Sequence, residues 1–375
     1  MKFLHLSDLH IGKNVNGFSM IPDQKHILRQ ILECVRTEKP TAVIIAGDVY
    51  DRAIPGVDAV RLFDDFITEL AEENVAVLLV AGNHDSPERL SFANRLLTDK
   101  QIFFDGIFNG AMQKIILSDE FGSVNFWLLP FVKPSLGVGS YEDVINTALT
   151  ASGINYNMRN VLISHQFYTK PNVTPIRSES ELSPVGGLDA VNAGIVEKFD
   201  YVALGHLHGR QRVGERHIRY CGSPLKYSFS EIGQQKSVTV VEIKEKGELA
   251  IDSLPLIPLH DMREIKGEID KLMSDEISSL ADKEDYLRVI LTNEDEIIDP
   301  MGKLRSVYPN VMSLSIENSR ANIDISAIEP AIETVEQFST YELFEEFFLT
   351  VQGTQMEEKQ GEIVRNLLEK QGDVE

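Results

Sequence analysis

The chain has 375 residues and a formal net charge of −22, from 58 acidic and 36 basic side chains. A length of this size allows two or three domains at about 100–200 residues each. The sequence contains none of the ~18-residue apolar runs that span a bilayer, and its first eight residues lack the apolar region of a secretory signal. Cys34 and Cys221 are its two cysteines, so a disulfide framework is excluded and a reducing, cytoplasmic location without a membrane is expected.

Short apolar segments rich in β-branched residues alternate with helical patterns through the first 254 residues. The predicted strands are Phe3–Leu6, Ala42–Ala46, Val75–Val80, Val161–Ile163, Tyr201–Leu204 and Val238–Ile243. The predicted helices are Gln24–Arg36, Val57–Glu73 and Pro87–Leu97. This alternation predicts an α/β fold in which helices flank a layered sheet.

The acidic residues are unevenly distributed along the chain. Residues 255–375 hold 27 acidic and 11 basic side chains, against 31 and 25 in residues 1–254. Pro255 and Pro258 lie at the change and would interrupt a continuing strand or helix. We therefore predict a first domain over 1–254, a small α+β domain over 255–330 and a helical tail over 331–375. The name capping domain is used for 255–330, and the role in that name is one that only the family resemblance described below implies.

The capping domain is predicted to contain two helices and two strands. In chain order these are Met262–Leu280, Leu287–Leu291, Pro300–Val307 and Val311–Ile316, of which the first and third are the helices. In the tail, Phe344, Phe347, Phe348 and Val351 fall on one face of an amphipathic helix. This apolar face either completes the core of the capping domain or binds a partner protein, and the acidity around it disfavours DNA.

Five of the predicted strands end in a small residue followed by side chains that can bind a metal ion. The endings are Ser7-Asp8-Leu9-His10, Gly47-Asp48-Val49-Tyr50-Asp51, Gly82-Asn83-His84-Asp85, Ser164-His165 and Gly205-His206-Leu207-His208. Ligands of open α/β sheets bind at the carboxyl ends of the strands, so these turns can converge on one site. A single Asp-x-His or Gly-Asn-His-Asp is more often an ordinary cap or turn, and His165 alone could equally be an interior histidine, whereas five such endings in one chain indicate a metal centre.

The candidate ligands are imidazoles, carboxylates and one carboxamide, a set that suits Mn²⁺, Fe²⁺ or Zn²⁺. Six or seven ligands are too many for one ion, whereas two ions bridged by one carboxylate would use them all. A pair of ions can activate water and stabilise the charge that develops at phosphorus. The sequence therefore predicts phosphoester hydrolysis.

The ordered set Asp-x-His, Gly-Asp-x-x-Asp, Gly-Asn-His-Asp, His and Gly-His-x-His resembles the calcineurin-like metallophosphoesterase superfamily. The resemblance implies a layered β-sandwich flanked by helices, with one ion on Asp8, His10, Asp48 and His208. The second ion would lie on Asp48, Asn83, His165 and His206, with Asp48 bridging. His84 would contact the scissile phosphate and assist the leaving oxygen, and Asp85 would orient the ring of His84.

Three further segments, Arg177–Glu181, Tyr220–Glu231 and Leu287–Thr292, resemble the SbcD family, the nuclease subunits of bacterial SbcCD complexes in DNA repair, recombination and replication. This resemblance implies two Mn²⁺ ions, exonuclease action on duplex DNA ends and endonuclease action on single strands and hairpins. It also implies docking of the C-terminal segment on an SbcC-type ATPase. The helices after the second and third motifs would form a homodimer within a heterotetramer.

Five basic residues follow the fifth motif and are candidate DNA contacts: Arg210, Arg212, Arg216, Arg219 and Lys226. A solvated charged hairpin explains them equally well. The candidate partner contacts are Phe344, Phe347 and Phe348.

Two other functions use the same residues. A phosphodiesterase or phosphatase for small molecules or phosphoproteins would need the metal site, but neither the capping domain nor the tail. An inactive phosphoesterase fold that serves as a scaffold would be expected to have lost ligands or His84, and all are present.

Overall fold

The structure is a computed structural model that describes residues 1–134, 139–171, 173, 175–181, 190–318, 340–341, 344–345, 348–349, 355–356 and 358–372. The chain divides into two compact units, Met1–Met262 and Arg263–Glu375. Their boundary lies eight residues after the boundary predicted at 254. The second predicted boundary, at 330, lies outside the described residues, so the three-part division stays a prediction.

One six-stranded sheet of the first unit carries three of the five motifs. Its strands, in spatial order, are β16 (Leu249–Pro255), β15 (Ser237–Ile243), β1 (Lys2–Leu6), β4 (Ala42–Ala46), β5 (Ala76–Val80) and β6 (Ile102–Asp105). Strands β1, β4, β5 and β6 are parallel, whereas β15 and β16 are antiparallel to their neighbours. The carboxyl ends of β1, β4 and β5 therefore lie at the same edge of this sheet.

A second six-stranded sheet carries the other two motifs. Its order is β13 (Gln211–Val213), β14 (Glu215–Tyr220), β12 (Tyr201–Leu204), β9 (Arg159–Ser164), β8 (Gly122–Leu129) and β7 (Gln113–Asp119). The four central strands are parallel, and the edge strands β13 and β7 are antiparallel to their neighbours. Strands β9 and β12 thus bring His165 and the last motif to one edge of the sheet.

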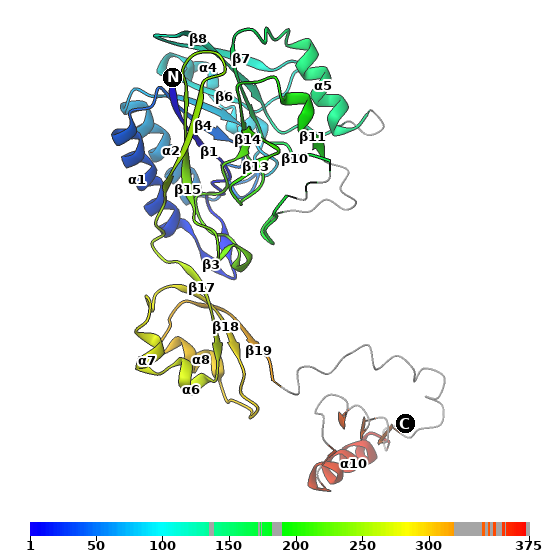
Figure 1. Ribbon diagram of the computed structural model, residues 1–375. Coiled ribbons are helices and arrows are strands. Elements are labelled where there is room, and N and C mark those ends of the chain that lie inside the picture. Colours follow the sequence, from blue (N-terminus) through cyan, green and yellow to red (C-terminus); the bar gives the residue numbers. More distant parts are fainter. Residues whose placement is uncertain are drawn as a thin grey trace. The chain divides into compact units, whose positions relative to one another are not determined.

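The two sheets pack face to face around a buried core. Phe3 of the first sheet contacts Phe126 and Tyr201 of the second, with ring centroids 5.6 and 5.7 Å apart in edge-to-face geometry. Helix α5 (Tyr141–Ala151) packs Ile145 and Ala148 on the outer face of the second sheet. Helices α1 (Ile21–Glu38) and α2 (Val57–Glu72) lie beside the first sheet (Figure 1). The result is the layered α/β sandwich that the sequence predicts.

Shorter elements connect these layers. They are β2 (Asn14–Val15), β3 (Phe18–Ser19), α3 (Pro87–Leu90), α4 (Asn94–Leu97), η1 (Thr98–Lys100), β10 (Tyr168–Thr169), β11 (Val191–Asn192), η2 (Ala193–Val196) and η3 (Phe229–Glu231). The single helix predicted over Pro87–Leu97 is wrong, because Ala93 adopts a left-handed conformation with φ 60° and separates α3 from α4.

The second unit contains a small α+β fold, a three-stranded sheet with short helices around its own hydrophobic core. Its elements are β17 (Met262–Gly267), α6 (Ile269–Leu272), α7 (Asp275–Ser278), β18 (Tyr286–Leu291), α8 (Pro300–Arg305), β19 (Val311–Ile316) and α10 (Glu358–Gly372). The helix predicted over Met262–Leu280 is wrong: its first residues form a strand at the edge of the sheet, and two single-turn helices follow. The other three predicted elements are present.

Candidate metal centre

All five motifs follow strands directly and meet at one end of the sandwich. Asp8 and His10 follow β1, Asp48 follows β4, Asn83 to Asp85 follow β5, His165 follows β9, and His206 and His208 follow β12. A hydrogen bond joins the two sheets there: the backbone N–H of His206, after β12, donates to both carboxylate oxygens of Asp8, after β1, at 3.0 and 3.1 Å. The ends of parallel strands thus assemble residues that are up to 200 positions apart in the chain.

One group of ligand atoms gathers around Asn83. Its Oδ1 lies 3.2 Å from His165 Nε2 and 3.1 Å from His206 Nδ1. His165 Nε2 lies 3.2 Å from Asp48 Oδ2. Asn83 thus lies beside both rings, and ligand atoms of Asp8, Asp48 and His165 lie within 4.8 Å of one another. Asp48, Asn83, His165 and His206 are the residues that the family resemblance assigns to the second ion.

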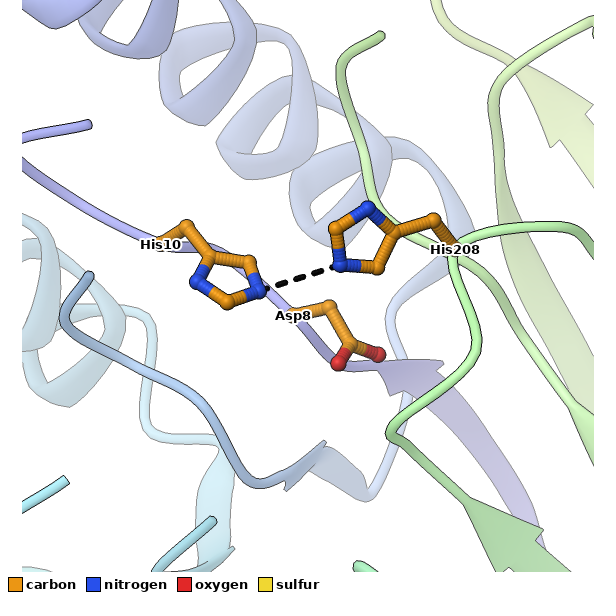
Figure 2. Close-up of side chains that lie close together, drawn as sticks. All are labelled: Asp8, His10 and His208. Atoms are coloured by element: carbon orange, nitrogen blue, oxygen red, sulfur yellow. Dashed lines mark hydrogen bonds between the residues drawn. The ribbon is translucent and has the colours of Figure 1, made fainter. Parts of the chain in front are cut away.

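A second group gathers around His10. Its Nε2 lies 3.1 Å from Nε2 of His208, and Asp8 lies beside both rings (Figure 2). Atoms of Asp8, His10 and His208 that could bind a metal lie within 4.8 Å of one another. The Oδ2 of Asp48 lies 3.6 Å from His10 Nε2, so the oxygen that faces His165 also faces this group. Asp48 therefore stands between the two groups, as a bridging ligand must.

The chemistry of these residues fits divalent cations. Two imidazole nitrogens that face each other at 3.1 Å cannot both point lone pairs inward without a proton or a cation between them. Asp8, His10, Asp48, His165 and His208 are buried, and buried charge needs a partner of opposite sign. Burial by itself would raise the pKa of Asp48, but the nearby rings of His165, His10 and His84 lower it, so its carboxylate stays ionised.

The ring of His165 is oriented by the backbone. Its Nδ1 donates to the carbonyl oxygen of Ala46 at 2.6 Å, which directs Nε2 toward Asp48 and Asn83. Burial by itself would lower the pKa of His165, but the carboxylates of Asp48 and Asp8 raise it to about 9. In the metal-free chain this imidazole is therefore protonated at neutral pH, and a cation would have to displace that proton.

Four of the ligands adopt backbone conformations that L-amino acids rarely take. The φ angles of Asp8, His10, Asp48 and His206 are 52°, 44°, 50° and 101°. Each such residue costs roughly 1–3 kcal/mol. Gly82 shows how crowded the site is, because a Cβ there would meet Asp48 Oδ1 at 2.1 Å. The packed strands thus hold the ligands in a strained arrangement that isolated turns would not keep.

The structure orients His84 in a different way from the one that the sequence suggests. His84 Nδ1 donates to the carbonyl oxygen of Asp51 at 2.9 Å, which leaves Nε2 to exchange a proton. The carboxylate of Asp85 instead accepts the backbone N–H groups of Gly82, Val49 and Tyr50 at 2.9, 3.2 and 3.0 Å. The prediction that Asp85 orients the His84 ring is therefore corrected: Asp85 holds the two strand ends together.

The five predicted DNA contacts do not form one surface. Arg210 is exposed directly after the fifth motif, and Arg212 is exposed on β13. Arg216 lies on β14, four residues before the strand's carboxyl end, about 13 Å away at ~3.3 Å per residue. Arg219 is partly buried, and Lys226 forms an ion pair with Asp261 at 2.7 Å. Arg216 in particular lies toward the opposite edge from the metal ligands.

Three other cations stand on aromatic rings that touch the ligand histidines. Arg177 lies over Phe167 at 4.0 Å from the ring centroid, and that ring lies 5.9 Å from the ring of His206. In the same way, Lys133 stacks on Phe131 beside His165, and Lys13 stacks on Tyr227 beside His10 and His208. No spacing pattern in the sequence marks these pairs, because nothing local links a cation to a ring that is distant along the chain.

The predicted partner contacts lie in a region that is described only in part. Phe344 is exposed and Phe348 is half-buried, whereas Phe347 lies outside the described residues. Among the helices that the structure describes, none is both long and apolar enough to cross a membrane.

The sandwich and the ligands at its edge define a metallophosphoesterase. The family model described as "Calcineurin-like phosphoesterase" matches residues 1–210, and that described as "Type 5 capsule protein repressor C-terminal domain" matches 258–352. The chain is 33% identical over 326 residues to the SbcD subunit of the SbcCD nuclease from Staphylococcus epidermidis, a match that covers 84% of this chain and 85% of that protein. The chain belongs to the SbcD family of nuclease subunits, and it is a phosphoester hydrolase.

Two solved structures show more distant likenesses. A dimetal phosphatase from Danio rerio has a TM-score of 0.42 and 15% identity, covering 68% of this chain and 96% of its own. A protein from Thermus thermophilus has a TM-score of 0.40 and 11% identity, covering 67% and 98%. At these scores, neither likeness adds weight to the family match.

Binding of Mn²⁺ to the metal-free chain at about pH 7.5 should release a proton, because the pKa of His165 lies near 9 and Nε2 must be deprotonated to coordinate. Calorimetric titration in two buffers of different ionisation enthalpy measures this proton. The His165→Gln variant is the control and should release fewer protons. Equal heats in both buffers for the unmodified chain would contradict the prediction.

Proposed function

We propose that the chain is a two-metal DNA nuclease that hydrolyses phosphodiesters with Mn²⁺, cutting duplex ends as an exonuclease and single strands or hairpins as an endonuclease. The main support is the convergence of seven ligand side chains on two groups that share Asp48 Oδ2. Divalent ions in such a site neutralise phosphoryl oxygens and help to ionise water. Family membership adds the nuclease activity of relatives.

The residues of the chain provide the rest of the mechanism. The ligands with partly exposed side chains, Asn83 and His206, lie on the side from which a phosphate can approach, and His84 is partly exposed on the same side. The ring of His84 stands perpendicular to that of His10, with centroids 4.7 Å apart. With Nδ1 held by the Asp51 carbonyl, His84 can donate a proton from Nε2 to the leaving oxygen.

A polyanionic substrate is supported by the cations that surround the centre. Arg177 and Lys133 are exposed, and each is stacked on a ring that contacts a ligand histidine. Such stacking limits the side-chain motion of a cation. Phosphates on either side of the scissile bond would meet these groups, which a small phosphate monoester would not reach.

The His84→Gln variant should keep its Mn²⁺ content and lose DNA cleavage by about 10²–10⁴-fold, the usual contribution of a general acid. Cleavage of labelled hairpin DNA is measured with Mn²⁺, together with metal content by elemental analysis. His217→Gln is the matched control, since His217 bonds to the Glu197 carbonyl on the neighbouring loop. Cleavage by His84→Gln at the unmodified rate would refute the role of His84.

The same preparation distinguishes the nuclease from a phosphatase. A nuclease should hydrolyse bis-p-nitrophenyl phosphate faster than p-nitrophenyl phosphate, whereas a phosphatase should prefer the monoester. Rapid monoester hydrolysis without DNA cleavage would favour the small-molecule phosphatase.

The single variants Arg177→Ala and Lys133→Ala should each weaken DNA binding. Each should also make the plot of the log of the binding constant against the log of the salt concentration less steep by about 1 for each lost phosphate contact. Fluorescence anisotropy of labelled DNA at several salt concentrations measures both effects. The Arg216→Ala variant removes the same charge near the opposite edge and should bind as the unmodified chain does. Equal losses in all three variants would indicate a general effect of charge.

A homodimer is supported by an apolar surface on the helices after the second and third motifs. Val57, Val60, Phe92 and Leu96 are exposed there, Phe92 to 81%. A cavity of about 670 Å³ lies on this surface and is lined by residues of α2 and of the segment 89–104. Exposed apolar patches of this kind mark protein interfaces.

The Phe92→Asp variant should shift the chain from dimer to monomer, because a charge would be buried in the apolar contact. Light scattering coupled to gel filtration measures the mass. Ile257→Asp is the matched control, because Ile257 is also exposed and its backbone bonds to Gln30 of α1, away from α2 and the segment 89–104. A monomeric unmodified chain would contradict the proposal.

The remaining proposals concern the second unit and the location. Residues 255–330 would help DNA to reach the centre, and the tail from 331 would dock on an SbcC-type ATPase in the cytoplasm, giving a heterotetramer. A chain ending at residue 331 should lose the ATPase while keeping diesterase activity on the small substrate. Loss of both activities would show that the tail is part of the nuclease fold.

A further inference from the structure

His208 is held at each of its polar atoms by a different partner. Its N–H donates to Glu181 Oε1 at 2.7 Å, and its carbonyl accepts from Lys236 Nζ at 2.9 Å. On the ring, Nδ1 lies 2.8 Å from Ser180 Oγ, and Nε2 faces His10. Three of these four atoms are therefore occupied within the chain, and Nε2 is the atom directed into the metal centre.

The partner of Nδ1 belongs to a hydrogen-bonded relay of three side chains, the half-buried Ser180 and the buried Glu231 and Lys236. Ser180 Oγ lies 2.7 Å from Glu231 Oε1, and Glu231 Oε2 lies 2.6 Å from Lys236 Nζ. Glu231 is fully buried, and Lys236 also bonds to Ser223 Oγ at 3.0 Å and Gln234 Oε1 at 2.7 Å. A buried ion pair of this kind is costly unless every donor and acceptor is used, and here the lysine is surrounded by acceptors.

The charged groups Lys236 and Glu231 determine which atom donates in each hydrogen bond of the relay. An ammonium group can only donate, and an ionised carboxylate can only accept. Ser180 has one hydroxyl proton, which must go to Glu231, so its oxygen accepts from Nδ1–H of His208. His208 then carries its proton on Nδ1 and a lone pair on Nε2, which is the tautomer that binds a metal.

We propose that Ser180, Glu231 and Lys236 are positioning residues that fix the tautomer of His208 and thereby set the affinity of the metal position formed by Asp8, His10 and His208. This inference rests on the proposed metal centre. The other position does not depend on such a relay, because His165 donates directly to the backbone of Ala46. The two positions should therefore respond differently to changes in the relay.

The relay also connects the metal centre to the segment 175–181. Ser180 belongs to this segment, which bonds to the loop of Glu231 through Glu179 N–H and Ser230 Oγ at 3.0 Å. It is also joined to β13 by two bonds between the Ile176 backbone and the Gln211 side chain, at 2.9 and 2.7 Å. The position of the segment 175–181 against its neighbours should therefore affect the affinity of the metal position that includes His208, and the reverse.

The Glu231→Gln variant tests the direction of the relay with little change of shape. The amide oxygen can still accept from Lys236, but the NH₂ group then donates to Ser180. The Ser180 proton is free to turn to Nδ1 of His208, which moves the ring proton to Nε2 and blocks coordination. Calorimetric and EPR titrations with Mn²⁺ on the full chain should show one of two ions weakened about 10–100-fold.

Two further variants calibrate this result. Ser180→Ala should weaken the same ion less, because Glu231 Oε1 lies 3.4 Å from Nδ1 and can accept directly. Glu181→Gln removes an equal charge beside His208, but its oxygen can still accept the backbone N–H, so it controls for charge alone. ¹⁵N NMR of the histidine rings in the metal-free chain should report the tautomer change in Glu231→Gln and not in Glu181→Gln.

The inference is overturned if Glu231→Gln, folded by circular dichroism, loses no more affinity than Glu181→Gln, or if it weakens both ions equally. If the unmodified chain binds two Mn²⁺ ions and the variants bind both with unchanged affinity, the relay is refuted but the proposed metal centre is not. An unmodified chain that binds no Mn²⁺ would refute the proposed metal centre as well.

Discussion

The arrangement of the site depends on the carboxylate of Asp48. Its Oδ2 lies 3.2 Å from His165 Nε2 and 3.6 Å from His10 Nε2, and its Oδ1 accepts the His84 N–H at 2.9 Å. Because this carboxylate is buried, its charge must be balanced by cations or protonated imidazoles on both sides. Asp48 thus belongs to both groups of ligands, whereas the other side chains of each group are oriented by separate partners.

The sandwich supplies the rigidity that this centre needs. Several candidate ligands have positive backbone φ angles, and position 82 must be glycine because the side chain of Asp48 packs against its backbone. Such strain persists only where the surrounding packing is strong. Here the strands that precede the ligands are almost wholly buried between two apolar layers, and their parallel hydrogen bonds fix the ends relative to one another.

The acidity of the chain is consistent with a nuclease. Residues 255–375 account for a net −16, since they hold 27 of the 58 acidic but 11 of the 36 basic side chains. In the first unit, acids such as Asp8 and Asp48 are buried at the candidate metal centre, whereas Arg177 and Lys133 are exposed on rings that lie beside candidate ligand histidines. The net charge of the chain therefore does not predict its affinity for a phosphate backbone, because that affinity depends on the charges near the site.

The sequence by itself indicated six strands of the first unit and the candidate ligands that follow five of them. Five of the six strands predicted in the first unit are buried parallel strands, which are continuous apolar runs, and the sixth, β15, is antiparallel but equally buried. The candidate ligands were recognisable because each follows one of the five parallel runs directly. Strand β7 was missed because its side chains alternate between half-buried and exposed, and the strand at Met262 because its pattern is short and polar.

Only the tertiary structure decided which groups orient the ligands. Asp85 is adjacent to His84 in sequence, yet it holds backbone N–H groups, and the carbonyl of Asp51 orients the ring. Ser180, Glu231 and Lys236 reach His208 from separate loops, and no local pattern marks them. The ligands are encoded by local spacing, whereas their partners are set by packing between distant segments, which the sequence does not display.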